Sequence, residues 1–184
     1  MALAKKSPEF IELVRKRNAS TSVGASTARN MGTGTVKAAR VFLRNLDLLR
    51  FVTESEVAFL RSLDLSTVEC SRELPCKSWG AARKFLNIFL RDAMYNRFLC
   101  DHFGLAIIED FLEVPLDKSV ALGLHGEPGG ESLPAWRTVV GLTPADSATY
   151  QAFARRIALE KGFARVHLDL CYYRRDAHED NSLL

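Results

Sequence analysis

Apolar side chains recur at helical spacing through the middle of the chain, and this pattern limits the fold more than any other sequence feature. Between Gly80 and about His102 they return every three or four positions, as on one face of a helix. They are Phe85, Ile88, Phe89, Leu90, Met94 and Phe98. We therefore expect an all-α protein built around this long helix, with Gly104 as its stop.

Capping signals and helix breakers divide the rest of the chain into shorter helices. Ser7 stands before a first-turn proline and acid, which is typical of a helix start, whereas residues 18–34 are rich in Ser, Thr and Gly and favour a loop. Residues 164–175 fit a helix or a strand, and we expect a helix because no convincing strand exists to pair with them. The expected helices are residues 8–17, 35–45, one begun by the capping box Thr53-Glu54-Ser55-Glu56, 80–102, 115–124, 144–161 and 164–175.

Length and composition indicate one domain of an ordinary kind. The chain has 184 residues, of which 47% are hydrophobic, and this is enough for one core, so we expect a single helical domain over residues 1–184. The net charge of +3 is compatible with nucleic acid without requiring it. The four cysteines lack a CxxC pair, which favours free thiols in a reducing compartment. With neither a secretory signal nor a membrane-spanning run, a cytoplasmic protein is expected.

Two short segments stand out as carriers of chemistry. Residues 80–90 read GAARKFLNIFL, and residues 114–120 read VPLDKSV. The first places Lys84 early in a helix, and the second places Asp117 just after a proline. A neutral lysine is a nucleophile, and a carboxylate stabilises positive charge or moves protons. Taken alone, Lys84 reads as a solvated helix lysine and Asp117 as a helix cap, so the interpretation depends on the pair.

Together the two segments resemble the helix-hairpin-helix DNA glycosylase superfamily over about residues 75–122. The family pattern is close to Gly-x-Gly-Arg/Thr-Lys-x-x-Asn-x-x-Leu, followed later by Pro/Ala-Val-Asp-Thr-x-Val. This chain reproduces the two parts as Gly80, Ala82, Arg83, Lys84, Asn87 and Leu90, and as Pro115, Leu116, Asp117, Ser119 and Val120. The interval from Lys84 to Asp117 is most similar to that of the archaeal 8-oxoguanine glycosylase branch.

The chain departs from the family pattern at two places. The second hairpin glycine is Ala82, and the usual Leu-Pro-Gly-x-Gly run is stretched over residues 74–80, LPCKSWG. A hairpin with a different bend, or one less able to approach a phosphate, follows from these departures.

The resemblance implies a DNA-glycosylase-like helical bundle whose hairpin and catalytic segment occupy about residues 74–122. A hairpin that leads into a helix N-terminus offers free N–H groups to a phosphate of double-stranded DNA. Arg29 and Asn30 suit base or phosphate contacts, although their Ser/Gly-rich loop also reads as a plain linker. Trp79 and Tyr95 either stack on a base or pack in the core. The expected DNA-contacting residues are Lys77, Trp79, Gly80, Ala82, Arg83, Arg29 and Asn30.

The implied activity is excision of a damaged or modified base after the nucleotide is everted from the duplex. Lys84 is the candidate for Schiff-base formation at C1′ and AP-lyase activity, with Phe85, Phe89 and Trp79 as apolar neighbours that would favour the neutral amine. Asp117 is the candidate for stabilising the charged sugar, and it alone would matter if Lys84 lay too far away.

The substrate stays open between 8-oxoguanine and a hypermodified phage cytosine, the second pointing to antiviral defence. No cofactor is implied, because the cysteines lack the clustered spacing that iron–sulfur members need, and His167 and Asp169 would face different sides of a helix rather than share a metal. The alternatives are a non-catalytic helix-hairpin-helix DNA-binding module and an unrelated helical interaction protein.

Overall fold

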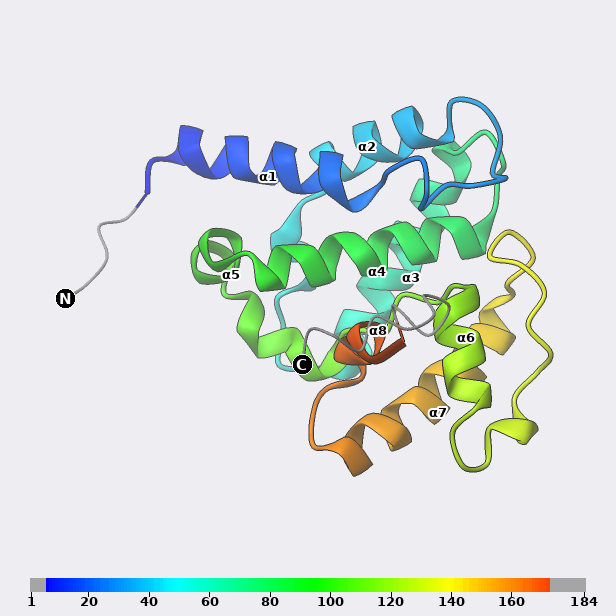
Figure 1. Ribbon diagram of the computed structural model, residues 1–184. Coiled ribbons are helices and arrows are strands. Elements are labelled where there is room, and N and C mark those ends of the chain that lie inside the picture. Colours follow the sequence, from blue (N-terminus) through cyan, green and yellow to red (C-terminus); the bar gives the residue numbers. More distant parts are fainter. Residues whose placement is uncertain (1–5, 173–184) are drawn as a thin grey trace, which may run out of the picture.

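The computed structural model describes residues 6–172, and within this range the chain is helical without any strand, as expected (Figure 1). The α-helices are α1 (Pro8–Ser22), α2 (Thr35–Asn45), α3 (Glu56–Glu73), α4 (Trp79–Tyr95), α5 (Arg97–Phe103), α6 (Lys118–His125), α7 (Pro144–Lys161) and α8 (Leu168–Tyr172). The 3₁₀ helices are η1 (Leu48–Phe51), η2 (Leu105–Phe111), η3 (Gly130–Ser132) and η4 (Arg165–His167).

Helix α4 runs through the centre of the molecule, and its buried apolar residues belong to the first of two hydrophobic cores. Figure 1 shows α1 and α2 on one side of α4 and α6, α7 and α8 on the other. The first core joins α1 to α5 around fully buried Phe59, Phe85 and Phe89. The second joins α6, α7 and α8 around Tyr150 and Tyr172. A side chain of α4 that points between the two cores therefore lies in a seam, where clefts form readily.

Helix α7 follows the sequence expectation closely. The Thr143 hydroxyl accepts a hydrogen bond from Asp146 N at 3.1 Å, and Gly162 ends the helix in the left-handed region at φ 80°. Both are the capping arrangements that their residue types favour. The boundaries of α2 and the glycine stop at Gly104, with φ 71°, are confirmed in the same way.

Helix α1 is longer than expected, because residues 18–22 continue it instead of beginning the loop. The hydroxyls of Ser20 and Thr21 donate to the carbonyls of Lys16 and Arg17, at 2.8 Å and 3.1 Å. Such bonds to the preceding turn satisfy Ser and Thr inside a helix. Ala19 is fully buried against the first core, so packing supplies what the helix propensity of this segment lacks.

The long helix expected over residues 80–102 is broken in two at Asn96. This residue ends α4, and its side-chain oxygen accepts hydrogen bonds from Phe98 N and Leu99 N at the start of α5. An asparagine that caps the next helix allows a sharp change of direction without any loss of helical apolar spacing on either side. The periodicity was therefore right, and the single continuous helix was wrong.

Two expected helix starts are displaced by two or three residues. Ser55, rather than Thr53, caps α3, and the Thr53 hydroxyl instead accepts from Ser55 N at 3.1 Å. Pro115 does not begin a helix: the chain stays extended until Asp117, whose carboxylate caps α6. The extended segment before Asp117 is held by buried side chains, which the sequence pattern of a proline-initiated helix does not reveal.

The final segment is helical as far as Tyr172, formed by η4 and α8, and residues 173–175 lie outside the described residues. The four cysteines are free thiols, as expected. Within residues 6–172, no helix combines the length and the apolar character that crossing a membrane requires.

The loop over residues 133–142 folds back over the first turn of α4, and this changes the interpretation of Gly80. A Cβ at Gly80 would lie 2.1 Å from the Val139 carbonyl oxygen and 2.7 Å from Leu142 Cβ. The Ser78 hydroxyl accepts from Ala81 N at 3.1 Å and donates to the Val140 carbonyl at 2.9 Å. Gly80 thus admits the protein's own backbone, and the expectation that it admits a DNA phosphate is wrong.

We expect Gly80→Ala to lower the free energy of unfolding by about 1–3 kcal/mol, because the added methyl group overpacks a backbone contact that cannot move aside. Gly141→Ala is the matched control in the loop that covers Gly80, since its Cβ would meet the Thr138 hydroxyl at 3.3 Å and the Thr138 carbonyl oxygen at 3.9 Å. Urea unfolding of both variants measures the difference. Equal stability of the two variants would contradict the packing described here.

Candidate functional site

Lys84 and Asp117 face each other in the seam between the two cores. Lys84 Nζ lies 3.4 Å from Asp117 Oδ2, and the lysine side chain is only 9% exposed. The amine donates no hydrogen bond to any residue that the structure describes, although a buried ammonium ordinarily finds several acceptors. Asp117 Oδ1 is occupied by Val120 N at 3.1 Å, so the cap of α6 and the contact with Lys84 use different oxygens of one carboxylate.

A buried ion pair fixes α4 relative to the segment that carries Asp117. Arg83 forms two hydrogen bonds to Glu113, at 2.8 Å from Nε and 2.9 Å from a terminal nitrogen, and both side chains are 6% exposed. Asn87 donates to the same carboxylate at 3.0 Å. Burial raises the pKa of Glu113, but the hydrogen bonds and charge of Arg83 outweigh it and hold this pKa below its ordinary value. The carboxylate is thus charged and fully engaged.

The backbone on either side of Glu113 is held by two further buried side chains. The amide of Gln151 both accepts from Val114 N, at 3.1 Å, and donates to Val114 O, at 2.8 Å. Arg165 donates to the carbonyls of Leu112 and Phe111, at 3.1 Å and 2.9 Å. These bonds satisfy an extended, buried segment that has no strand partner. Asp117 therefore emerges from a rigid support.

Two adjoining cavities meet at Lys84 and Asp117, and Ser26 and Thr27 also line both. The first, of about 640 Å³, is called the basic cavity here; its own lining residues include Arg29, Lys118 and Arg137. The second, of about 330 Å³, is called the acidic cavity; its own lining residues include Asp92, Asp169 and Arg91. Both volumes fall within the ~300–1,000 Å³ typical of small-molecule sites.

The three cations of the basic cavity have no acidic partner among the described residues. Arg29, Lys118 and Arg137 are exposed and come from the loop after α1, the first turn of α6 and the loop before α7. Trp136 lines the same cavity and packs edge-on against Tyr150, with ring centroids 5.8 Å apart. The opening thus combines free positive charge with one aromatic surface, a combination that suits an anionic, ring-containing ligand.

The acidic cavity is held together by Arg91. Its guanidinium pairs with Asp92, at 2.8 Å, and with Asp169 of α8. Burial raises the pKa of Asp169, the Arg91 charge opposes this, and the nearby Asp117 charge adds to the increase. The Ser22 hydroxyl donates to Asp92 at 2.8 Å. Lys84 therefore has carboxylates on more than one side, which sequence spacing alone does not indicate.

Several residues expected to contact DNA are used inside the protein. Arg83 is buried and holds Glu113 and Asp64, so its expected phosphate contact is wrong. Ala82 is fully buried, and Trp79 is half-buried beneath the Arg83 guanidinium, 5.3 Å from the ring centroid. Lys77 is exposed in the turn before α4, where its ammonium bonds to the Arg72 carbonyl.

Other expected neighbours of Lys84 also lie elsewhere. Phe85 and Phe89 belong to the first core, and Ile88 lines the acidic cavity beside Lys84 instead. Tyr95 stacks on His167 with its hydroxyl 2.7 Å from Nδ1, and His167 Nε2 lies 2.7 Å from Glu109. Arg29 and Asn30 do line the basic cavity, together with Lys84 and Asp117.

Sequence reasoning missed Glu113, Asp169 and Arg137. Glu113 precedes the motif by one residue, and a lone glutamate before an apolar run was a detectable signal of a buried pair. Asp169 was considered only for metal binding, and it joins the site through the position of α8. Nothing in the local sequence marks Arg137, because its loop reaches the site only through tertiary folding.

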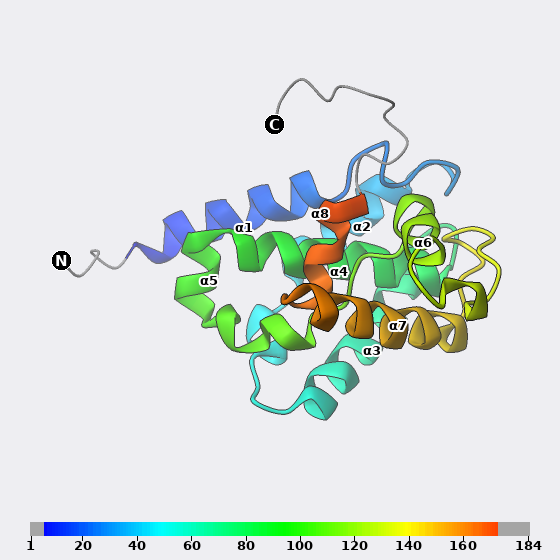
Figure 2. The same ribbon diagram turned by 60° about the horizontal axis from the view of Figure 1, so that its bottom comes forward.

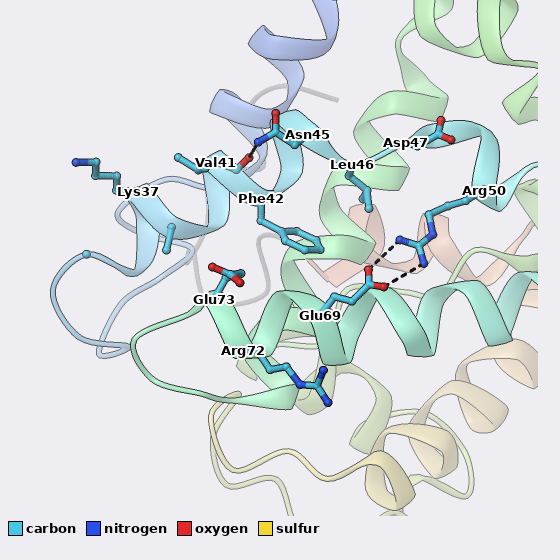
Figure 3. Close-up of a pocket in the computed structure, with 12 residues that line it drawn as sticks. Lys37, Val41, Phe42, Asn45, Leu46, Asp47, Arg50, Glu69, Arg72 and Glu73 are labelled. Carbon is cyan, nitrogen blue, oxygen red and sulfur yellow. Dashed lines mark hydrogen bonds and ion pairs between the residues drawn. The ribbon is translucent and has the colours of Figure 1, made fainter.

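A larger hollow, of about 860 Å³, lies between α2 and α3 and contains none of the expected site residues. Figure 3 shows Phe42 of α2 pointing toward α3, and Arg50 is paired to Glu69 at 2.9 Å. Its charges are mixed, Arg50 is paired and the Lys37 amine is exposed, so the hollow lacks the buried amine that distinguishes the Lys84 site.

Comparisons of the chain with family models, characterised proteins and solved structures give no match, so the site is interpreted from its own geometry.

We expect Glu113→Gln to lower the free energy of unfolding by about 3–5 kcal/mol, because it leaves the buried Arg83 charge without its main partner. Asp64→Asn is the matched control: it removes the 64% exposed partner of the same guanidinium and should cost less than about 1 kcal/mol. Urea unfolding at neutral pH measures both. Similar losses in the two variants would contradict the assignment of Glu113 as the buried anchor.

The same variant has a pH signature. Since the folded-state pKa of Glu113 is lowered, its stabilisation is present above its unfolded value of about 4.3 and is lost as the pH falls through the folded-state pKa. Glu113→Gln should therefore lose less stability on acidification than the wild-type protein does. An unchanged acid dependence would show that Glu113 does not contribute charge to stability.

Proposed function

We propose that this chain is a DNA glycosylase that everts and excises a modified base, with Lys84 as the nucleophile and Asp117 as the stabilising carboxylate. The observation that carries the proposal is the Lys84 amine, nine-tenths buried, unbonded by any described residue and 3.4 Å from Asp117 at the junction of two cavities. A structural lysine would spend its donors on the protein, and this one keeps them for a ligand.

The reaction follows from the two groups. The Lys84 nitrogen attacks C1′ of the everted nucleotide, a nitrogen–carbon bond forms, and the N-glycosidic bond breaks with its electrons leaving on the base, which takes up the proton that Asp117 receives from the amine. Asp117 Oδ2 accepts the proton released by the amine, and its charge stabilises the positively charged sugar before that. The Schiff base that follows ring opening permits elimination of the 3′-phosphate, which nicks the strand.

Positive charge around the basic cavity supports DNA as the partner. Arg29, Lys118 and Arg137 surround its opening, and none is neutralised by a described carboxylate. Phosphates flanking an everted nucleotide would meet these cations while the sugar reaches Lys84. The placement differs from the sequence expectation, in which the turn before α4 supplied the phosphate contacts.

The α3–α4 connection supports the family interpretation in outline. Residues 74–78 join two packed helices by a tight turn, in which Lys77 adopts a left-handed backbone at φ 47°. We infer that this is the expected helix-hairpin-helix, placed so that Lys84 comes six residues into α4 rather than in its first residues. Which base is excised, 8-oxoguanine or a hypermodified phage cytosine, is then decided by the cavities.

The central test is covalent trapping on abasic DNA with borohydride. We expect the wild-type protein to form an adduct that Lys84→Ala abolishes and Lys37→Ala retains, because Lys37 lines the α2–α3 hollow and neither cavity of the site. Asp117→Asn should slow base release by about 100-fold or more on a duplex that the wild type cleaves.

The outcomes separate three functions. Base release without an adduct would assign a monofunctional glycosylase that depends on Asp117. Tight DNA binding with neither product would support the non-catalytic binding module and overturn the proposal. Circular dichroism melting of each variant checks that the loss comes from the site and not from unfolding.

Removing one rim cation should weaken DNA binding and its salt dependence together. We expect Arg29→Ala, Lys118→Ala and Arg137→Ala each to reduce the number of released counterions by about one, seen as a shallower slope of log affinity against log salt. Lys37→Ala is the control, since Lys37 lines the α2–α3 hollow instead. Equal effects of all four variants would place the DNA elsewhere.

A further inference from the structure

We propose that Asp169 reads the everted base, so that the substrate is a base presenting a hydrogen-bond donor, such as an exocyclic amino group, to the acidic cavity. This inference rests on the proposed function and adds the chemical class of its substrate. It arises from the way the cavities divide around Lys84 and from one free oxygen on α8.

The two cavities offer different surroundings on the two sides of the reacting pair. The basic cavity presents Arg29, Lys118 and Arg137, which suit the phosphates. The acidic cavity presents Asp169, Asp92 and several hydroxyl groups, which would repel phosphate and suit the polar edge of a base. With C1′ between Lys84 and Asp117, the base therefore extends into the acidic cavity.

Within that cavity, Asp169 is the carboxylate with an oxygen to spare. Its Oδ2 accepts from Arg91, and Oδ1 forms no hydrogen bond with any described residue. No fully buried side-chain oxygen in the described range lacks a partner, so Asp169 Oδ1 is accessible to solvent, and Asp169 lines the acidic cavity. Asp92, by contrast, spends Oδ1 on Arg91 and Oδ2 on the Ser22 hydroxyl.

A carboxylate held in this way distinguishes bases that present a hydrogen-bond donor from bases that present an acceptor. Arg91 fixes its orientation, and the remaining oxygen accepts a hydrogen bond but does not donate one while it is charged. A base with an amino group satisfies it, whereas a carbonyl oxygen at the same position would meet it with like partial charge. Sites built around such a bond reject the analogue that lacks the donor far more strongly than apolar pockets reject a methyl group. The hydroxyls of Ser26 and Thr27 can donate to a carbonyl or accept from an amino group, so they do not distinguish the two kinds of base.

The test uses pairs of bases in which one member carries an amino group that the other lacks. Duplexes carry 5-hydroxymethylcytosine or 5-hydroxymethyluracil, which exchange an amino group for a carbonyl, and 8-oxoguanine or 8-oxohypoxanthine, which differ by one amino group. We expect single-turnover excision of the amino member to be faster by about 10- to 100-fold in at least one pair, the range for a hydrogen bond to a charged group.

Variants locate the preference. In Asp169→Asn the preference should fall to within about threefold, because an amide both donates and accepts. Asp92→Asn is the matched control, since it also removes a carboxylate from Arg91 but leaves the free oxygen of Asp169, and it should keep the wild-type preference. If Asp169→Asn does not fold, Asp169→Glu retains the charge and should shift the preference between the two members without removing it.

Three results would overturn the inference: equal excision of both members in each pair, a preference that Asp169→Asn leaves intact, and excision of none of the four bases. The adduct with abasic DNA requires no base, so it reports separately on the proposed function. If the adduct forms but neither member of a pair is excised faster, the role of Asp169 is contradicted and Lys84 remains the nucleophile.

Discussion

The buried ion pair between Arg83 and Glu113 is the constraint on which the arrangement of this molecule depends. Arg83 directly precedes Lys84 on α4, and Glu113 lies four residues before Asp117. The Arg83–Glu113 ion pair, which links the two cores, therefore positions both Lys84 and Asp117. Breaking it would strand a charge in the interior, which is far more costly than losing a surface contact. Gln151 and Arg165 complete the support by holding the backbone of residues 111–114.

Because the surrounding residues hold the backbone, Lys84 and Asp117 keep side-chain atoms available to a ligand. Asp117 caps α6 with one oxygen and faces Lys84 with the other, so the residue is both structural and available. Lys84 has its hydrocarbon stem buried in the seam and its amine at the meeting point of two cavities. Figure 2 shows α8 crossing near α4, the ion pair of Arg91 with Asp169 joins the two helices, and Asp169 lines the acidic cavity but not the basic one. The charge therefore changes sign across the site.

The sequence was sufficient for the helical class, for the caps of α7 and for the candidate pair of Lys84 and Asp117, because each depends on local periodicity or on motif spacing. It was insufficient wherever long-range packing decided the outcome. Gly80 and Arg83 fit a phosphate-binding hairpin by pattern, yet one admits the Val139 carbonyl and the other pairs with Glu113. Residues 18–22 read as a loop until the burial of Ala19 is known. Arg137 and Asp169 reach the site from distant segments that no local pattern connects to it.

The account depends most on the claim that the Lys84 amine reaches the sugar carbon. The direct measurement is mass-spectrometric mapping of the peptide that carries the nucleotide after the protein is incubated with abasic DNA and borohydride. A single modified site at Lys84 is the expected result. Modification spread over exposed lysines such as Lys77 and Lys118, with Lys84 unmodified, would contradict it.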